Sequence, residues 1–130
     1  MIQKKAKAID AKDKAMKIAQ LALEKRAENV VILDLRGLTS ITDYFVICTG
    51  ASDTQVKAIS TNIENELKKE AIRPWHREGL TSLNWVLLDY IDVVAHVFLP
   101  EIRDFYSLER IWGDAEKIEV KDEQRTDDKV

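Results

Sequence analysis

The sequence has very little cysteine and lacks any long hydrophobic run. Its single cysteine, Cys48, cannot form an internal disulfide, and the apolar neighbours in YFVIC predict a buried thiol. No window approaches the roughly 18 to 20 consecutive apolar residues of a membrane-spanning helix. The first residues hold no apolar segment of the signal-peptide type, and Asp10 and Asp13 argue against an organellar transit peptide. We therefore expect a cytoplasmic protein without a membrane partner.

Excess positive charge of the kind that binds nucleic acid is also missing. The chain carries 20 Lys and Arg against 23 Asp and Glu, which gives a net charge of -3. Affinity for nucleic acid comes mostly from clustered Lys and Arg that meet phosphates. We therefore expect no direct nucleic-acid binding, and we expect any macromolecular partner to be basic.

The length and composition predict one folded domain. A chain of 130 residues is too short for two full cores and a linker, and 45% hydrophobic with 33% charged residues is typical of a soluble globular protein. The two ends are rich in charge. We predict a flexible extension over residues 1–12, a folded domain over residues 13–117 and a disordered tail over residues 118–130.

Hydrophobic periodicity predicts two helices and two strands in the first half. Apolar residues recur at helical spacing over residues 13–28, and the β-branched run over residues 30–36 is typical of a strand covered on both faces. Residues 43–50 form the second predicted strand. Ser52 and Gln55 then match a capping box at the start of a helix that runs to about residue 71, before Pro74.

The second half predicts a tight antiparallel hairpin followed by a helix. Two β-rich runs, residues 83–90 and 92–99, follow each other almost without a gap. A loop of Tyr90 and Ile91 would give the pairs Asp89–Asp92, Leu87–Val94 and Trp85–His96. After Pro100 we expect one helix over about residues 101–112, with Phe105 on its apolar side. The order predicts an α/β fold with a mixed β-sheet flanked by helices, and no G-x-G-x-x-G motif of a Rossmann fold occurs.

Alternation along this hairpin gives its two faces different characters. One face is entirely apolar and is expected to face the core: Val86, Leu88, Val93, Ala95 and Val97. The other is mixed: Trp85, Leu87, Asp89, Asp92, Val94 and His96. A helix of the same chain could cover the mixed face, but it would bury two carboxylates at a cost. An uncovered Trp with an acidic rim is typical of a surface that binds a basic protein.

Other candidate sites have less support. A zinc site needs three or four ligands, and His76, His96 and Cys48 lie on different predicted elements without paired spacing. Ser52 after Gly50 is similar to the phosphate-binding loop of nucleotidyltransferases, but the paired carboxylates that hold magnesium there are missing. We therefore expect no metal and no cofactor, and we interpret Ser52 as an ordinary N-cap.

In combination, the motifs resemble the ribosomal silencing factor family, also called the Iojap-related family. The resemblance spans about residues 13–115 and depends on ITDY (41–44), TGAS (49–52), EG (78–79), NWVLLDYIDVVAHVF (84–98) and RDFYSLERIW (103–112). It implies a nucleotidyltransferase-like fold that has no enzymatic activity. Ile91 departs from the small residue usual in the family, and because Ile resists a positive φ, the sequence leaves the turn type open.

The resemblance also implies a mechanism. Family members dock on the fourteenth protein of the large ribosomal subunit, at the surface where the small subunit joins. They block subunit joining sterically and repress translation when nutrients are scarce, as in stationary phase. The partner-facing residues that the resemblance implies are Trp85, Leu87, Asp89, Tyr90 and Asp92, with Glu78, Gly79 and His96 as neighbours. Trp85 would be the anchor, and the two aspartates would accept from Lys or Arg. The resemblance further implies a homodimer in the free state.

Two other functions remain open from the sequence alone. The first is a nucleotide-binding enzyme of the nucleotidyltransferase type that uses residues 50–53 as a phosphate cradle. The second is a homodimeric scaffold in which the Trp85 face is the contact between the two copies. Calorimetry with magnesium and nucleoside triphosphates tests the first, and light scattering of the wild type beside Trp85→Ala tests the second.

Overall fold

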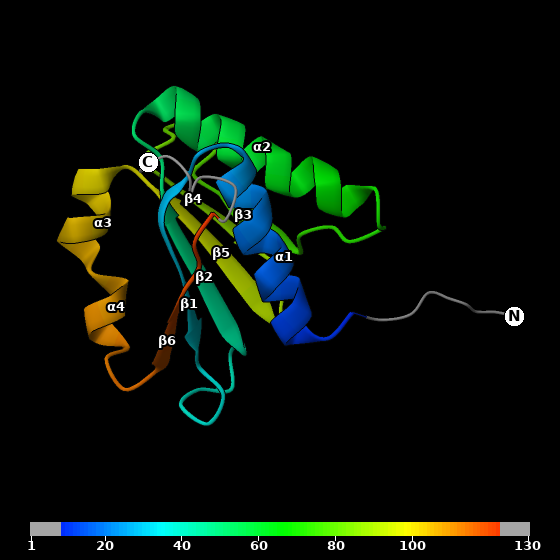
Figure 1. Ribbon diagram of the computed structural model, residues 1–130, viewed down its shortest axis with the longest axis vertical. Helices are drawn as coiled ribbons and strands as arrows, with labels where there is room; N and C mark the ends of the chain where they lie inside the picture. The colour runs from blue at the N-terminus through cyan, green and yellow to red at the C-terminus, as the bar shows by residue number, and fades with distance from the viewer. Residues whose placement is uncertain (1–8, 123–130) are drawn as a thin grey trace, which may run out of the picture.

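The computed structural model describes residues 9–122, which form one six-stranded sheet with helices on both faces (Figure 1). The elements are α1 (Ala11–Glu24), β1 (Glu28–Asp34), β2 (Tyr44–Thr49), α2 (Asp53–Lys68), β3 (His76–Glu78), β4 (Trp85–Asp89), β5 (Val93–Phe98), α3 (Pro100–Tyr106), α4 (Leu108–Ile111) and β6 (Glu116–Glu119). The strand order is β3-β4-β5-β2-β1-β6, and only β2 and β5 pair in parallel. The predicted α/β fold with a mixed sheet is confirmed.

The helices α1 and α2 cover the first face of the sheet (Figure 1). Apolar residues at helical spacing in α2, among them Ile59 and Ile63, pack against alternate residues of the strands, among them Val46 and Val97. All four side chains are at most 1% exposed. Among residues 9–122, no helix has the length and apolar character needed to cross a membrane.

The helices α3 and α4 cover only part of the second face. Ile102, Leu108 and Trp112 pack on a smaller cluster that includes Ile47 and Phe98. The single helix predicted over residues 101–112 is wrong, because Ser107 adopts a left-handed conformation with φ 48° and separates α3 from α4. The expected packing of Phe105 on the sheet is also wrong, because this residue of α3 is 78% exposed.

The β4–β5 hairpin has the predicted faces but a different register. Asp89 lies opposite Val94, and Trp85 lies opposite Phe98, so the loop is Ile91 and Asp92. Ile91 takes the positive φ of 78° that its β-branched side chain disfavours, while its N–H donates to Asp89 Oδ1 at 2.8 Å. The shift is an even number of residues and therefore leaves the strand residues on their predicted faces. Asp92 is the exception, because it lies in the loop and pairs with Lys14 of α1.

The helices and strands among the described residues reach past the predicted boundaries of the domain at both ends. The helix α1 begins at Ala11, because the side chain of Asp10 caps it by accepting from the Asp13 N–H at 2.9 Å. The strand β6, which the sequence analysis did not predict, pairs with β1 and places Ile118 opposite Ile32. This strand holds a single apolar residue, so its hydrophobic pattern is too weak to predict a strand from the sequence. Residues 1–8 and 123–130, which make up most of the two predicted extensions, lie outside the described residues.

Gln55 connects the start of α2 to the end of α1. Ser52 Oγ accepts from the Gln55 N–H at 3.2 Å, as the predicted capping box requires, but Gln55 Oε1 accepts from the N–H of Ala51 at 2.9 Å. The amide Nε2 of the same side chain donates to the carbonyl oxygens of Lys25 and Arg26, both at 3.0 Å. One side chain therefore satisfies backbone groups at two helix ends.

We expect Gln55→Ala to lower the free energy of unfolding by about 1–2 kcal/mol, because it leaves these backbone groups without their side-chain partner. Urea unfolding followed by circular dichroism measures the change. Thr54→Ala is the matched control on the exposed neighbour and should change stability by no more than about 0.5 kcal/mol. Equal effects of the two substitutions would show that the connection contributes nothing.

Candidate docking surface

The mixed face of the hairpin continues onto the neighbouring edge strand. In an antiparallel pair, residues directly opposite each other share a face. Leu87 lies opposite Glu78 and Asp89 lies opposite His76, so both β3 residues join the face that carries Trp85. We call these five residues the β4 surface: His76, Glu78, Trp85, Leu87 and Asp89. Each of them is half-buried or exposed.

Trp85 is held in one orientation by contacts on three sides. Its indole N–H donates to Nδ1 of His96 at 3.1 Å. The ring centroids of Phe98 and Tyr106 each lie 4.8 Å from that of Trp85. The side chain remains half-buried, so part of the indole faces solvent while its orientation is fixed by its neighbours. Trp85 is therefore an ordered aromatic group at the edge of the smaller core cluster.

His96 lies beneath the β4 surface and does not form part of it. It is 4% exposed, and burial lowers its pKa from the ordinary 6.5 to about 3, so the imidazole is neutral. Because Nδ1 accepts from Trp85, the proton of the neutral ring belongs on Nε2. Nε2 has no hydrogen-bond partner among residues 9–122. The prediction that His96 and Val94 line an open face is therefore wrong, since both are buried.

The carboxylates of the hairpin differ in their partners. Asp92 Oδ1 accepts from Nζ of Lys14 at 2.7 Å, which ties the hairpin turn to α1. Glu78 pairs with Nε2 of His76 at 2.7 Å. Asp89 caps the turn, and among the described residues it has no ion-pair partner. Asp92 is thus matched within the molecule, while Asp89 presents uncompensated charge on the β4 surface.

Two of the predicted partner-facing residues have structural positions instead. Tyr90 is 4% exposed on the opposite face, within the core under α1 and α2, where burial raises its pKa. Gly79 has φ 84°, and a Cβ at this position would lie 1.9 Å from the carbonyl oxygen of Trp85. Only glycine fits there, because the chain between β3 and β4 passes against the backbone of β4. Neither residue presents a side chain to a partner.

The start of α2 has the geometry of an ordinary N-cap. The N–H groups of Ala51 and Gln55 are taken by side-chain oxygens of Gln55 and Ser52, so two amides of the supposed phosphate cradle are occupied. Gly50 is needed for packing, since a Cβ there would lie 2.9 Å from Val56. Within residues 9–122, no three His, Cys, Asp or Glu side chains lie together as metal ligands would. Cys48 is 1% exposed, and this burial raises the pKa of its thiol to about 12, as expected for a core thiol.

A groove of about 870 Å³ between β1, β6 and α3 contains Arg103, which the sequence analysis did not single out. Its guanidinium donates to the carbonyl oxygen of Asn29 at 2.7 Å, to Thr49 Oγ1 at 2.9 Å and to both carboxylate oxygens of Glu109. Arg103 is 8% exposed, and the carboxylate of Glu109 balances its charge inside the fold. The guanidinium therefore joins α3 and α4 to the sheet.

Comparison with known proteins identifies the family. A family model described as "Ribosomal silencing factor during starvation" matches residues 8–130. The ribosomal silencing factor of Bacillus subtilis is 45% identical over 101 residues, which cover 77% of this chain and 86% of that protein. The chain belongs to the ribosomal silencing factor family. The Iojap protein of maize chloroplasts is similar as well, with 39% identity over 107 residues that cover 82% of this chain and 46% of that protein.

Solved structures with the same fold agree with this membership of the ribosomal silencing factor family. A crystal structure of a protein from Chromobacterium violaceum has a TM-score of 0.78 at 32% identity and covers 81% of this chain and 88% of that one. A second, from Bacillus halodurans, has a TM-score of 0.72 at 34% identity and covers 83% and 99% of the two chains. The resemblance seen in the sequence is therefore confirmed at the level of the family and the fold.

The buried, neutral His96 predicts loss of stability in acid. Below pH 6.5 the unfolded chain takes up a proton on this residue, whereas the folded chain does not until about pH 3. The contribution of His96 to the free energy of unfolding should therefore be fully present above pH 6.5. Between pH 6.5 and pH 3 it should fall by up to about 1.4 kcal/mol per pH unit.

Urea unfolding between pH 7 and pH 4.5 measures this slope. The control is His96→Asn, because the Oδ1 of asparagine can accept from the Trp85 indole without titrating. The slope of this variant should be smaller than that of the wild type. Parallel slopes would show that His96 is not the group responsible.

Proposed function

We propose that the protein silences translation by docking its β4 surface on a basic protein of the large ribosomal subunit and so preventing the small subunit from joining. The partner implied by the family resemblance is the fourteenth protein of the large-subunit series. The single observation that carries the proposal is the ordered, half-buried Trp85 on the same face of β4 as Asp89, whose carboxylate has no ion-pair partner among the described residues. Steric blocking requires no catalytic step. In this proposal the protein acts in the cytoplasm, on cytoplasmic ribosomes.

The fixed orientation of Trp85 supports a role as anchor. Aromatic residues dominate binding energy when they enter a pocket of the partner, and immobilising a side chain on binding costs free energy. Phe98, Tyr106 and His96 already hold the indole in the free protein. The entropy of the Trp85 side chain is therefore lost when the protein folds and not when it docks. Leu87 and the Trp85 ring supply the apolar centre of the contact.

Charge supports a basic partner, as ribosomal proteins generally are. Asp89 lies beside Leu87 without an ion pair in the described part of the chain, and the net charge of the protein is -3. A mouse relative, 29% identical over 98 residues that cover 73% of this chain, is named "Mitochondrial assembly of ribosomal large subunit protein 1". That name supports the large subunit as the place of action for a protein of this fold.

Repression by occupancy sets a concentration requirement. At a free concentration of about ten times the dissociation constant, about nine-tenths of the large subunits are held. Repression therefore grows with the amount of protein relative to ribosomes, which suits a response to scarce nutrients.

We also infer, from the family resemblance, that the free protein is a homodimer, and light scattering tests this state.

The first test of the proposal is co-sedimentation with purified large subunits, followed by addition of small subunits. Trp85→Ala should weaken binding by about 2 kcal/mol or more, close to thirtyfold, and restore subunit joining. Because Trp85 also packs on Phe98, the fold of the variant is checked by circular dichroism. Leu87→Lys places a charge on the half-exposed centre of the surface without opening the core and should weaken binding as well. Wild-type binding by both folded variants would remove the β4 surface from the mechanism.

The second test isolates charge at Asp89. Asp89→Asn keeps an oxygen that accepts from the Ile91 N–H and so preserves the turn. We expect about threefold to tenfold weaker binding at low salt, and a difference that shrinks as salt is added, because screening removes the attraction to the basic partner. Asp53→Asn removes an exposed charge at the start of α2 and is the matched control. A loss equal to that of the control would exclude a specific role for Asp89.

A further inference from the structure

Two aromatic residues of α3 continue the β4 surface beyond the sheet. The ring centroids of Trp85 and Tyr106 are 4.8 Å apart, and those of Tyr106 and Phe105 are 5.0 Å apart in an edge-to-face arrangement. Tyr106 is 46% exposed and Phe105 is 78% exposed. The three rings therefore form an unbroken line from β4 onto the helix.

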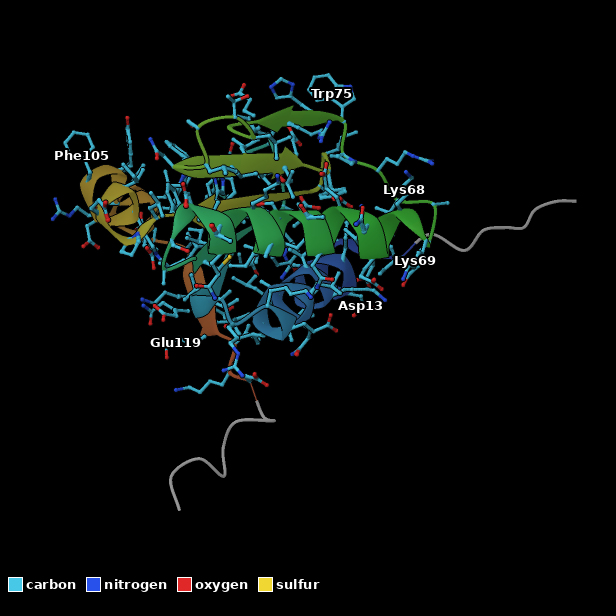
Figure 2. All side chains as sticks on the ribbon, turned by 90° about the horizontal axis from the view of Figure 1, so that it is seen from above. Asp13, Lys68, Lys69, Trp75, Phe105 and Glu119 are labelled. Carbon is cyan, nitrogen blue, oxygen red and sulfur yellow. The ribbon has the colours of Figure 1, made fainter. Side chains whose placement is uncertain are left out.

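Phe105 contributes little to the fold that displays it. The contacts of α3 with the smaller core cluster come from Ile102, while the buried Arg103 bonds to the sheet and to α4. Figure 2 shows Phe105 on the outer side of α3, directed away from the rest of the molecule. Single exposed apolar residues are ordinary, but adjoining exposed rings mark an interaction site.

The charges beside these rings are acidic. Glu101 lies one helical turn before Phe105, and Asp104 is the neighbour of Glu101 on the helix surface. Both are exposed, and neither has an ion-pair partner among residues 9–122. The arginine of α3 is turned inward and is bound to Glu109, so the outward side of α3 carries no cation of its own. Arg110 follows on α4, after the break at Ser107.

We propose that the α3 surface, made of Glu101, Asp104, Phe105 and Tyr106, is a second contact site that receives an arginine-bearing segment of the same basic ribosomal protein. A guanidinium stacks on aromatic rings and bonds to carboxylates, and α3 presents both groups together. Phe105 is the second anchor of the contact, and the acids of α3 select for arginine. This inference rests on the proposed function and extends its contact from the sheet to the helix.

The continuity of the rings explains why one partner occupies both surfaces. The ring of Tyr106 lies 4.8 Å from that of Trp85, and Phe105 lies 5.0 Å further along, so a partner that covers Trp85 finds α3 next to it. A stable interface also takes about 800 Å² from each protein and about 20 to 30 residues a side. The five residues of the β4 surface cannot supply that area alone. The helix α3 is the adjoining surface with matching aromatic and acidic character.

The test compares Phe105→Ala with Ile41→Ala in co-sedimentation with purified large subunits. Ile41 is 81% exposed and belongs to the loop between β1 and β2, so it controls for the loss of exposed apolar area. This loop is at the bottom of Figure 1, whereas α3 is at the upper left. Phe105→Ala should weaken binding by about tenfold or more, and Ile41→Ala by less than about twofold. Asp104→Lys should weaken binding most at low salt. Circular dichroism should show the wild-type fold, since all three side chains are exposed.

Each outcome separates the α3 surface from the proposed function. If Trp85→Ala weakens binding and Phe105→Ala does not, the second contact is wrong and the β4 docking stands. If Phe105→Ala instead turns a dimer into a monomer in light scattering while ribosome binding is unchanged, α3 is a contact between two copies and the inference is overturned. If neither variant changes binding, both the docking surface and its extension fail.

Discussion

The parallel pairing of β2 with β5 is the contact on which the rest of the architecture depends. It joins a first half, built on α1, β1 and β2, to the hairpin and α3, and its register sets Ile47 beside His96. Because β5 lies at the centre of the sheet, its two faces receive different covers. One face is closed by α1 and α2, whereas the other is closed by α3 and α4 only over part of its width.

This partial cover creates the surface on which the proposed function depends. Where α3 and α4 stop, Trp85 lies against Tyr106 on one side and Phe98 on the other, and a buried imidazole accepts its N–H. The surface is therefore ordered by the same packing that ends the core. Core and docking surface share residues, so substitutions here affect stability and binding together and have to be separated by experiment.

The sequence predicted what depends on local periodicity and not what depends on distant contacts. The faces of the hairpin follow from alternation and are right, while the register was misjudged because a strained Ile91 and the side chain of Asp89 set the turn. Tyr90 was assigned from the resemblance, although alternation places it with Leu88 in the core. The burial of His96 required knowledge of where Trp85 and Phe45 lie, and the ion pair of Asp92 required the position of Lys14.

The two edge strands of the sheet are short. The strand β3 has three residues, all exposed, and β6 has four residues, of which three are charged and one is isoleucine. Such edges offer few free backbone groups to another strand, and the charges disfavour pairing there. The sheet is therefore protected against growing by edge-to-edge addition. The β4 surface instead offers the side chains of a sheet face. In the proposed docking, recognition would therefore depend on aromatic rings and carboxylates more than on shared backbone hydrogen bonds.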